Sequence, residues 1–214
     1  MLSMHGPVVI GTEEQNDFQP VTPQSRLPGG SSVRTLDGAW LNLALLPGAL
    51  LQLSSNSEIK IEELKISKDG NETGDAMRSR TGRVRLNWGK ITILFSRSDK
   101  SASQLAISAR QATITADSDS LFCVQSDHAT TRLTCVRGKV YASPGAQSAV
   151  AIGAGYFQRW PSARLGTVAA AEDAAAQIDV VDSLEIGDQL RELQSGRQNR
   201  RPFLPGSVLT KKFD

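Results

Sequence analysis

The sequence predicts an all-β protein, built either as a twisted β-solenoid-like coil or as a stacked barrel or sandwich of short strands, with one short C-terminal α-helix. Triplets of the form apolar-x-apolar recur at short intervals, and clusters of Gly, Pro, Ser, Asn and Asp separate them. Aromatic residues make up only 5% of the chain, which suits thin layers of Val, Ile, Leu and Ala better than one thick core. After residue 168 the composition shifts to Ala, Glu, Asp, Gln and Leu, which is typical of a helix.

Length and charge restrict the classes of protein that fit. The 214 residues suffice for one domain of about 150 residues with extensions. With 24 basic and 22 acidic residues, the near-neutral balance argues against a nucleic-acid partner, because such binding depends on phosphate neutralisation. The longest apolar run, residues 41–53, is broken by Pro47 and Gly48, so no membrane span is predicted. Residues 1–11 lack the regions of a secretory signal, so either the protein is cytosolic or its leader is missing from this sequence.

In the N-terminal half, each expected strand is bounded by residues that favour turns. The stretch 12–32 permits at most an edge strand around Phe18 and Val21, because its prolines cannot donate ladder hydrogen bonds. The polar segment 68–79 is expected to be an exposed loop, in which residues 71–73 form a glycosylation sequon only if the source is eukaryotic and secretory. In chain order, the expected strands are residues 7–11, 32–36, 39–45, 50–53 and 58–66.

The second half continues the strand pattern. Residues 84–86 and 91–95 are expected to form a hairpin around Trp88 and Gly89, with Gly89 supplying a positive φ. Gly138 and Gly155 are expected to end strands at tight corners. The remaining expected strands are residues 105–108, 112–115, 121–125, 131–136, 139–142 and 150–152.

Cys123 and Cys135 are the two cysteines, on strands that flank a turn. If the turn is centred near residue 129, they face one another and a cross-strand disulfide can close. If instead Phe122 and Val124 point inward together with Leu133 and Cys135, then Cys123 points outward and both thiols stay free. Both alternatives are open at this point.

The helix is predicted from apolar residues at i, i+4 and i+7, which are Ile186, Leu190 and Leu193. Asp182 followed by Glu185 resembles a capping box, and Gly196 stands where a helix commonly ends, although Gly187 weakens the prediction. We expect the helix to pack back on the β domain or to engage a partner, and the basic, proline-broken end to be a solvated tail.

No catalytic, cofactor or metal site is predicted. His128 stands near Ser126 and Asp127 in a turn, but no third group or oxyanion motif accompanies them. Asp117 and Asp119 lack the glycine and distal glutamate of a calcium loop. The Gly-Ala-Gly segment 153–155 lacks the third glycine of a dinucleotide fingerprint, and two cysteines with two distant histidines make no zinc site. We therefore expect a protein that is not an enzyme.

The central segments resemble the FecR domain, in order as well as in composition. The resemblance covers residues 30–155, and the segments that carry it are residues 30–35, 50–57, 105–109, 120–124, 133–140 and 150–155. It implies an all-β domain, similar to a twisted solenoid or a stacked-strand barrel, that is found mostly outside the bacterial cytoplasmic membrane. The best-known members sense signals there and pass them to an N-terminal sigma-factor regulator, whereas others are stand-alone envelope modules. This sequence contains neither the sigma-binding region nor a membrane helix, and the family has no catalytic residues to carry over.

These observations together give one expected organisation. Residues 1–29 form an N-terminal edge strand and a Pro-rich lead-in, residues 30–160 form the FecR-like β domain, and residues 161–214 form a linker, the helix and a basic tail. The expected function is a non-enzymatic extracytoplasmic module for protein interaction or signal sensing, with an unidentified protein as partner. The alternative is a structural or carbohydrate-associated envelope component that binds cell-wall glycan, which a row of exposed aromatic residues would favour. A cytoplasmic location stays open.

Overall fold

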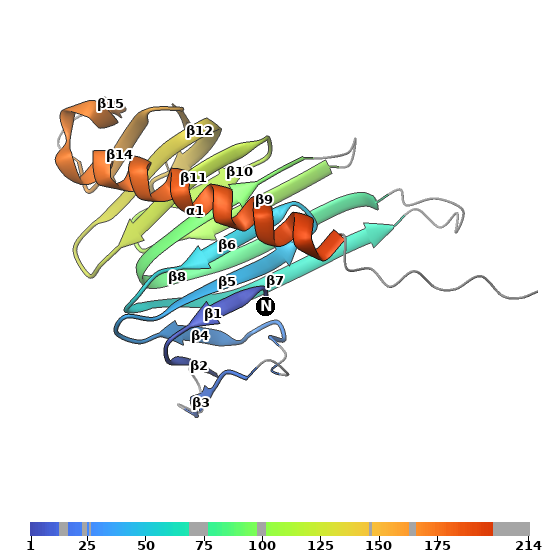
Figure 1. Ribbon diagram of the computed structural model, residues 1–214. Coiled ribbons are helices and arrows are strands. Elements are labelled where there is room, and N and C mark those ends of the chain that lie inside the picture. Colours follow the sequence, from blue (N-terminus) through green and yellow to red (C-terminus); the bar gives the residue numbers. More distant parts are fainter. Residues whose placement is uncertain are drawn as a thin grey trace, which may run out of the picture.

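The computed structural model describes residues 1–12, 17–22, 25, 27–68, 77–97, 102–145, 147–162 and 166–198. Within them the chain is mostly β-strand, with one long helix that lies across one face of the strands (Figure 1). The strands of the first part are β1 (Ser3–His5), β2 (Val8–Gly11), β3 (Gln19–Pro20), β4 (Ser32–Thr35), β5 (Trp40–Leu46), β6 (Ala49–Leu53) and β7 (Ser57–Lys68). Those of the second part are β8 (Met77–Phe95), β9 (Ala102–Ser108), β10 (Thr113–Ala116), β11 (Ser120–Ser126), β12 (Thr131–Ser143), β13 (Val150–Gly153), β14 (Tyr156–Trp160) and β15 (Val168–Ala169). A short 3-10 helix, η1 (Ala170–Glu172), leads into α1 (Ala174–Gln198).

Five strands close a barrel. β8 pairs with β9, β9 with β10, β10 with β12, β12 with β11, and β11 returns to β8. The β8–β9 pair is parallel and the other four are antiparallel. Additional strands extend the barrel, with β7, β4, β2 and β3 in one direction and β6, β5 and β1 in another. The barrel alternative is therefore confirmed, whereas the solenoid-like alternative is not supported, because a solenoid stacks its strands as parallel rungs.

The predicted hairpin at residues 84–95 is wrong, because β8 passes through Gly89 without reversing. Up to Trp88 the strand pairs with β7, and from Gly89 onward it pairs with β11. Gly89 has a φ of +93°, and a Cβ atom there would lie 2.5 Å from the Cα of Ser57. The glycine therefore supplies the positive φ that was expected, but it bends one strand from one sheet into another rather than making a turn.

Gly138 plays the same part in β12. The two strands expected at residues 131–136 and 139–142 are one strand, which pairs with β14 through its first half and with β13 through its second half. Gly138, with a φ of +73°, lies in the middle of this strand rather than at its end. The long strands β8 and β12 thus serve both sheets, and their glycines form the corners of the barrel.

The barrel interior is filled by aliphatic side chains from alternate strand positions. The four predicted inward residues Phe122, Val124, Leu133 and Cys135 are all fully buried in the main core cluster. The expected loop at 68–79 falls mainly on residues 69–76, which lie outside the described part, as does the tripeptide 71–73.

The helix begins earlier than predicted. Asp173, rather than Asp182, caps it, because the Asp173 Oδ1 accepts a hydrogen bond from the Ala176 amide at 2.9 Å. Gly196 lies inside the helix rather than beyond its end. The apolar edge is confirmed, since Leu190 is fully buried against the sheet. None of the described helices is long and apolar enough to span a bilayer.

Candidate interaction surface

Helix α1 is attached to the outer face of strands β6, β8, β11 and β12, and this attachment shapes the candidate surface (Figure 1). Leu190 packs with Leu50, Leu94 and Leu121 in a buried cluster beneath the helix. Gly187 faces Leu121 so closely that a Cβ atom would lie 2.9 Å from a Leu121 methyl group. The glycine that weakened the helix prediction therefore allows the helix to lie close to the sheet.

Four charged side chains form a second cluster under the same helix, in which Asp179 is buried and the other three are partly exposed. The Lys90 Nζ lies 3.0 Å from the Asp179 Oδ1 and 2.9 Å from the Asp182 Oδ2. The Arg132 Nε donates to the Asp179 Oδ2 at 2.8 Å, and the Thr134 hydroxyl donates to the same oxygen at 3.2 Å. Asp179 thus joins cations from β8 and β12 to α1, and we call this group the clamp cluster.

Asp179 is the centre of the clamp cluster, and its side chain is only 3% exposed. Burial on its own would lower the pKa of Lys90, but the hydrogen bonds to the carboxylates of Asp182 and Asp179, together with the charge of Asp179, favour the ammonium form and the pKa is raised above its usual value. A buried charge is tolerated only when it is paired and hydrogen-bonded, as Asp179 is here. Detaching the helix would therefore leave several charges without their partners.

The two cysteines are free and buried, which decides between the two alternatives raised by the sequence. Cys135 pairs with Phe122 and Cys123 with Thr134, so the two thiols point to opposite faces of the sheet. Cys135 faces the barrel interior. Cys123 faces outward as the second alternative held, but it is fully buried because α1 covers that face.

Burial keeps both thiols protonated. Desolvation, with the Asp179 carboxylate adding to it, raises the pKa of Cys123 to about 12. Desolvation also raises the pKa of Cys135 to about 11. Thiols that are buried and protonated are poor nucleophiles, so neither cysteine is a candidate reactive group.

These pKa values predict how stability changes with pH. In the unfolded chain the thiols ionise near pH 9.0, whereas in the folded protein they ionise near 12 and 11. The unfolded chain therefore loses protons first, so the contribution of the thiols to the free energy of unfolding should be constant below about pH 9 and fall as the pH rises from 9 towards 11. Urea unfolding across this range measures the slope. Cys123→Ala should make the slope less steep, because only Cys135 still contributes, and an unchanged slope in that variant would contradict the assignment.

An open groove lies between the C-terminal half of α1 and the strands β1 and β5. Its volume is about 750 Å³. The lining combines apolar side chains with a few polar groups, and its residues are Leu2, Ser3, Trp40, Asn42, Gln189, Glu192, Leu193 and Gly196. β1 contributes Ser3 to the lining, and the sequence does not predict this strand because three residues carry too little periodicity.

Two features of the groove suit recognition. Trp40 is half-buried and stacks on His5 with ring centroids 6.0 Å apart, so its ring is held in a fixed position. Asn42 is buried beside it, and its Nδ2 donates to the Ser3 hydroxyl at 3.0 Å. The Asn42 Oδ1 has no hydrogen-bond partner within the described part of the chain. A fixed aromatic ring beside buried polar groups is a common feature of sites that bind a ligand or a peptide.

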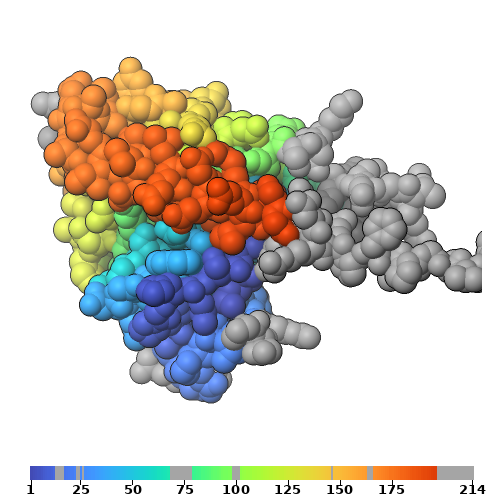
Figure 2. All heavy atoms as spheres, in the orientation of Figure 1, coloured from blue at the N-terminus to red at the C-terminus, as the bar shows by residue number. Residues whose placement is uncertain are grey.

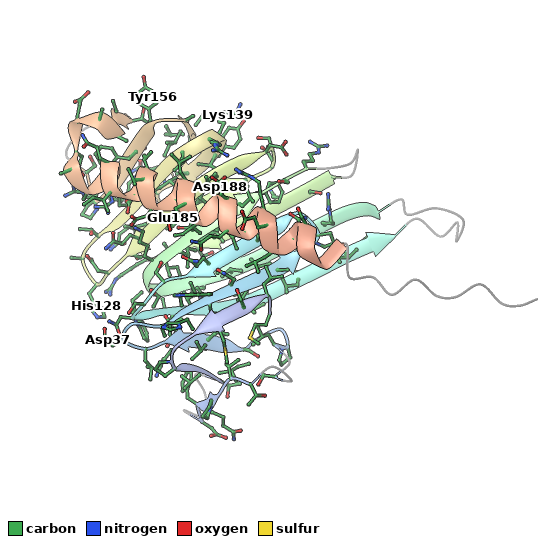
Figure 3. The ribbon with its side chains drawn as sticks, viewed as in Figure 1. Asp37, His128, Lys139, Tyr156, Glu185 and Asp188 are labelled. Carbon is green, nitrogen blue, oxygen red and sulfur yellow. The ribbon has the colours of Figure 1, made fainter. Side chains whose placement is uncertain are left out.

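The residues considered for catalysis are not brought together. His128 is exposed at the tip of the β11–β12 turn, which Figure 3 places at an end of the strands. Ser126 is buried and its hydroxyl bonds to Thr131, while Asp127 accepts hydrogen bonds from the amides of Thr130 and Ala129, which lower its pKa. The group is a structured turn.

The sites considered for metals and nucleotides are equally structural. Asp119 accepts a hydrogen bond from the Arg97 amide at 2.6 Å, and no group of three potential metal ligands occurs among the residues described. Residues 153–155 lie at the connection between β13 and β14.

The tryptophans do not form the exposed row that a glycan-binding surface would present. Trp40 stacks on His5, and Trp160 is only 5% exposed. The guanidinium carbon of Arg34 lies 5.2 Å from the centre of the Trp88 ring. A glycan partner therefore has no support from these rings.

The chain was compared with known proteins. The model of the FecR protein family matches residues 31–141, which is more than half of the chain. Two crystal structures of a candidate anti-sigma factor from Parabacteroides distasonis ATCC 8503, at 1.65 and 2.50 Å resolution, align with TM-scores of 0.46 and 0.47. Each is 14% identical, and the alignment covers 64% of this chain but only 57% of the other. Comparison with curated proteins gives no match.

Proposed function

The chain belongs to the FecR protein family, and from this membership we propose that it is a non-enzymatic module that senses a signal by binding a protein outside the bacterial cytoplasm. Members of this family that are known for signalling work in that compartment, and the family resemblance supports the location. A direct link to a sigma factor is not part of the proposal.

The groove between α1 and strands β1 and β5 is the observation that carries the proposal. It is open along its length and contains a fixed tryptophan, which is the residue type most enriched at the energetic centres of protein interfaces. Leu2 and Leu193 join Trp40 in the apolar part of the lining. A bound segment would rest an apolar side chain on these three residues and would meet the polar rim formed by Gln189 and Glu192.

The clamp cluster would keep the groove preformed in the absence of a partner. One wall of the groove is α1, and the ion pairs of Asp179 and Asp182 with Lys90 hold that helix on the sheet. A preformed wall spares the ordering cost that a flexible segment would incur on binding. The module would therefore recognise its partner with little rearrangement.

Photo-crosslinking in cells of the source organism tests the proposal. Replacing Leu193 in the groove by benzoylphenylalanine should give one dominant protein adduct, found in the envelope fraction after cell fractionation. The matched control carries the same group at Val150, which is 38% exposed on β13 and does not line the groove. Equal adducts from both positions, or an adduct confined to the cytosolic fraction, would refute the proposal.

A further inference from the structure

Helix α1 has a second surface of interest, on the side that faces away from the sheet. Five residues spaced alternately by four and three positions lie along this side, and we call them the outer seam: Ala174, Ile178, Val181, Glu185 and Asp188. The residues buried against the sheet, such as Asp179, Ser183 and Leu190, lie on the opposite side of the helix. Figure 2 shows α1 as an uncovered ridge on this face of the molecule.

The first half of the outer seam is apolar. Ile178 is 59% exposed and Val181 is 66% exposed, more than any other large apolar side chain in the described part of the chain. Both are β-branched, which is unfavourable in a helix unless packing compensates. An exposed helix face is normally polar, so neighbouring apolar residues on it indicate a surface that another molecule covers.

The second half of the outer seam is acidic. Figure 3 shows Glu185 and Asp188 on α1, and both side chains are exposed. Arg191 pairs with Asp188, and the Glu185 carboxylate accepts only a long hydrogen bond from Gln189 at 3.4 Å. Glu192 adds a further exposed carboxylate one turn on, so acidic groups outnumber basic ones along this part of the helix.

We propose that the outer seam binds an amphipathic helix of a partner protein, whose apolar residues cover Ile178 and Val181 and whose Lys or Arg residues lie beside Glu185 and Asp188. The alternating spacing of four and three is that of a coiled-coil seam, so the two helices would cross at about 20°. The charge selects a basic partner and disfavours an acidic one. This surface is distinct from the groove, and the proposal stands or fails separately from the proposed function.

The probe is a synthetic helical peptide of about three heptads with Leu at its seam positions over one half and Lys over the other. Two versions, with the basic half at either end, cover parallel and antiparallel packing. One fluorescein-labelled version should bind the purified full chain in an anisotropy titration, with affinity that falls as salt rises. A peptide with Glu in place of Lys should not bind.

Variants of the chain locate the binding. The double variant I178S/V181S should bind the basic peptide with an affinity lower by roughly tenfold or more. The double variant E185K/D188K should lower the affinity for the basic peptide by a similar factor and raise the affinity for the acidic peptide. All four side chains are exposed, so circular dichroism should show unchanged folding. The proposal would be overturned if neither version of the basic peptide binds, or if I178S/V181S binds the peptide as tightly as the original chain does. So would a dimer of the chain in sedimentation that I178S/V181S disperses, because the occupant would then be a second copy.

Discussion

Asp179→Ala should lower the free energy of unfolding by about 3 kcal/mol, because it removes the buried carboxylate at the centre of the clamp cluster from two partly buried cations. Arg132 would lose its only carboxylate among the contacts described and keep a hydrogen bond to Gln125, while Lys90 would keep Asp182. For a chain of this length the loss corresponds to a fall of about 10 °C in the midpoint of thermal unfolding. Thermal and urea unfolding followed by circular dichroism measure both quantities.

Asp188→Ala is the matched control on the same helix. Its side chain is 61% exposed and, within the described part of the chain, pairs only with Arg191 one turn away, so its removal should change the unfolding free energy by at most about 0.5 kcal/mol. Asp179→Asn keeps the shape of the side chain but not its charge, so its unfolding free energy should lie between those of Asp179→Ala and Asp188→Ala. If Asp179→Ala and Asp188→Ala are equally stable, the clamp cluster does not hold the helix.

Gly138→Ala should lower the free energy of unfolding by roughly 3 kcal/mol or more, because it disturbs a corner of the barrel. The residue has a φ of +73°, and a Cβ atom there would lie 2.0 Å from the carbonyl oxygen of Asp119. That atom belongs to the backbone and cannot move aside alone, so β11 and β12 would have to shift at their register change next to Leu121. Urea unfolding gives the difference from the original protein.

Gly155→Ala separates backbone strain from this clash. Gly155 has a similar φ of +80°, but a Cβ atom there meets nothing within 4 Å. It should therefore cost about 1 kcal/mol, which is the penalty for alanine at a positive φ. Equal losses at Gly138 and Gly155 would show that the close approach at Gly138 has no energetic role.

The period-2 patterns made most strands predictable, but the way the strands join was not. Gly89 and Gly138 have the sequence signature of turns, yet they sit inside strands, because the neighbours that pair on either side of each glycine belong to different sheets. Nothing in the local sequence distinguishes a bend between two sheets from a reversal. The FecR resemblance, expected over residues 30–155, was confirmed by the family match to residues 31–141.

The candidate site was harder to foresee because its parts are distant in the sequence. Lys90 and Asp182 are 92 residues apart, and each alone has the appearance of a solvated surface charge. Of the two alternatives for the cysteines, the one in which Cys123 faces outward is right for the barrel, but the burial of Cys123 depends on a helix that begins earlier than the periodicity predicts. A stronger signal was present in Asp173, whose position before the Ala-rich run is typical of a helix N-cap.

The central claim is that α1 is a fixed part of the domain and that the groove exists because the helix is docked. Hydrogen exchange of the purified protein, read by mass spectrometry on peptides covering residues 176–190, tests this most directly. The account predicts that these amides exchange as slowly as those of β11, since helix and strand would open only together. Exchange of α1 within seconds, while β11 stays protected, would show a helix that detaches freely and would contradict a preformed groove.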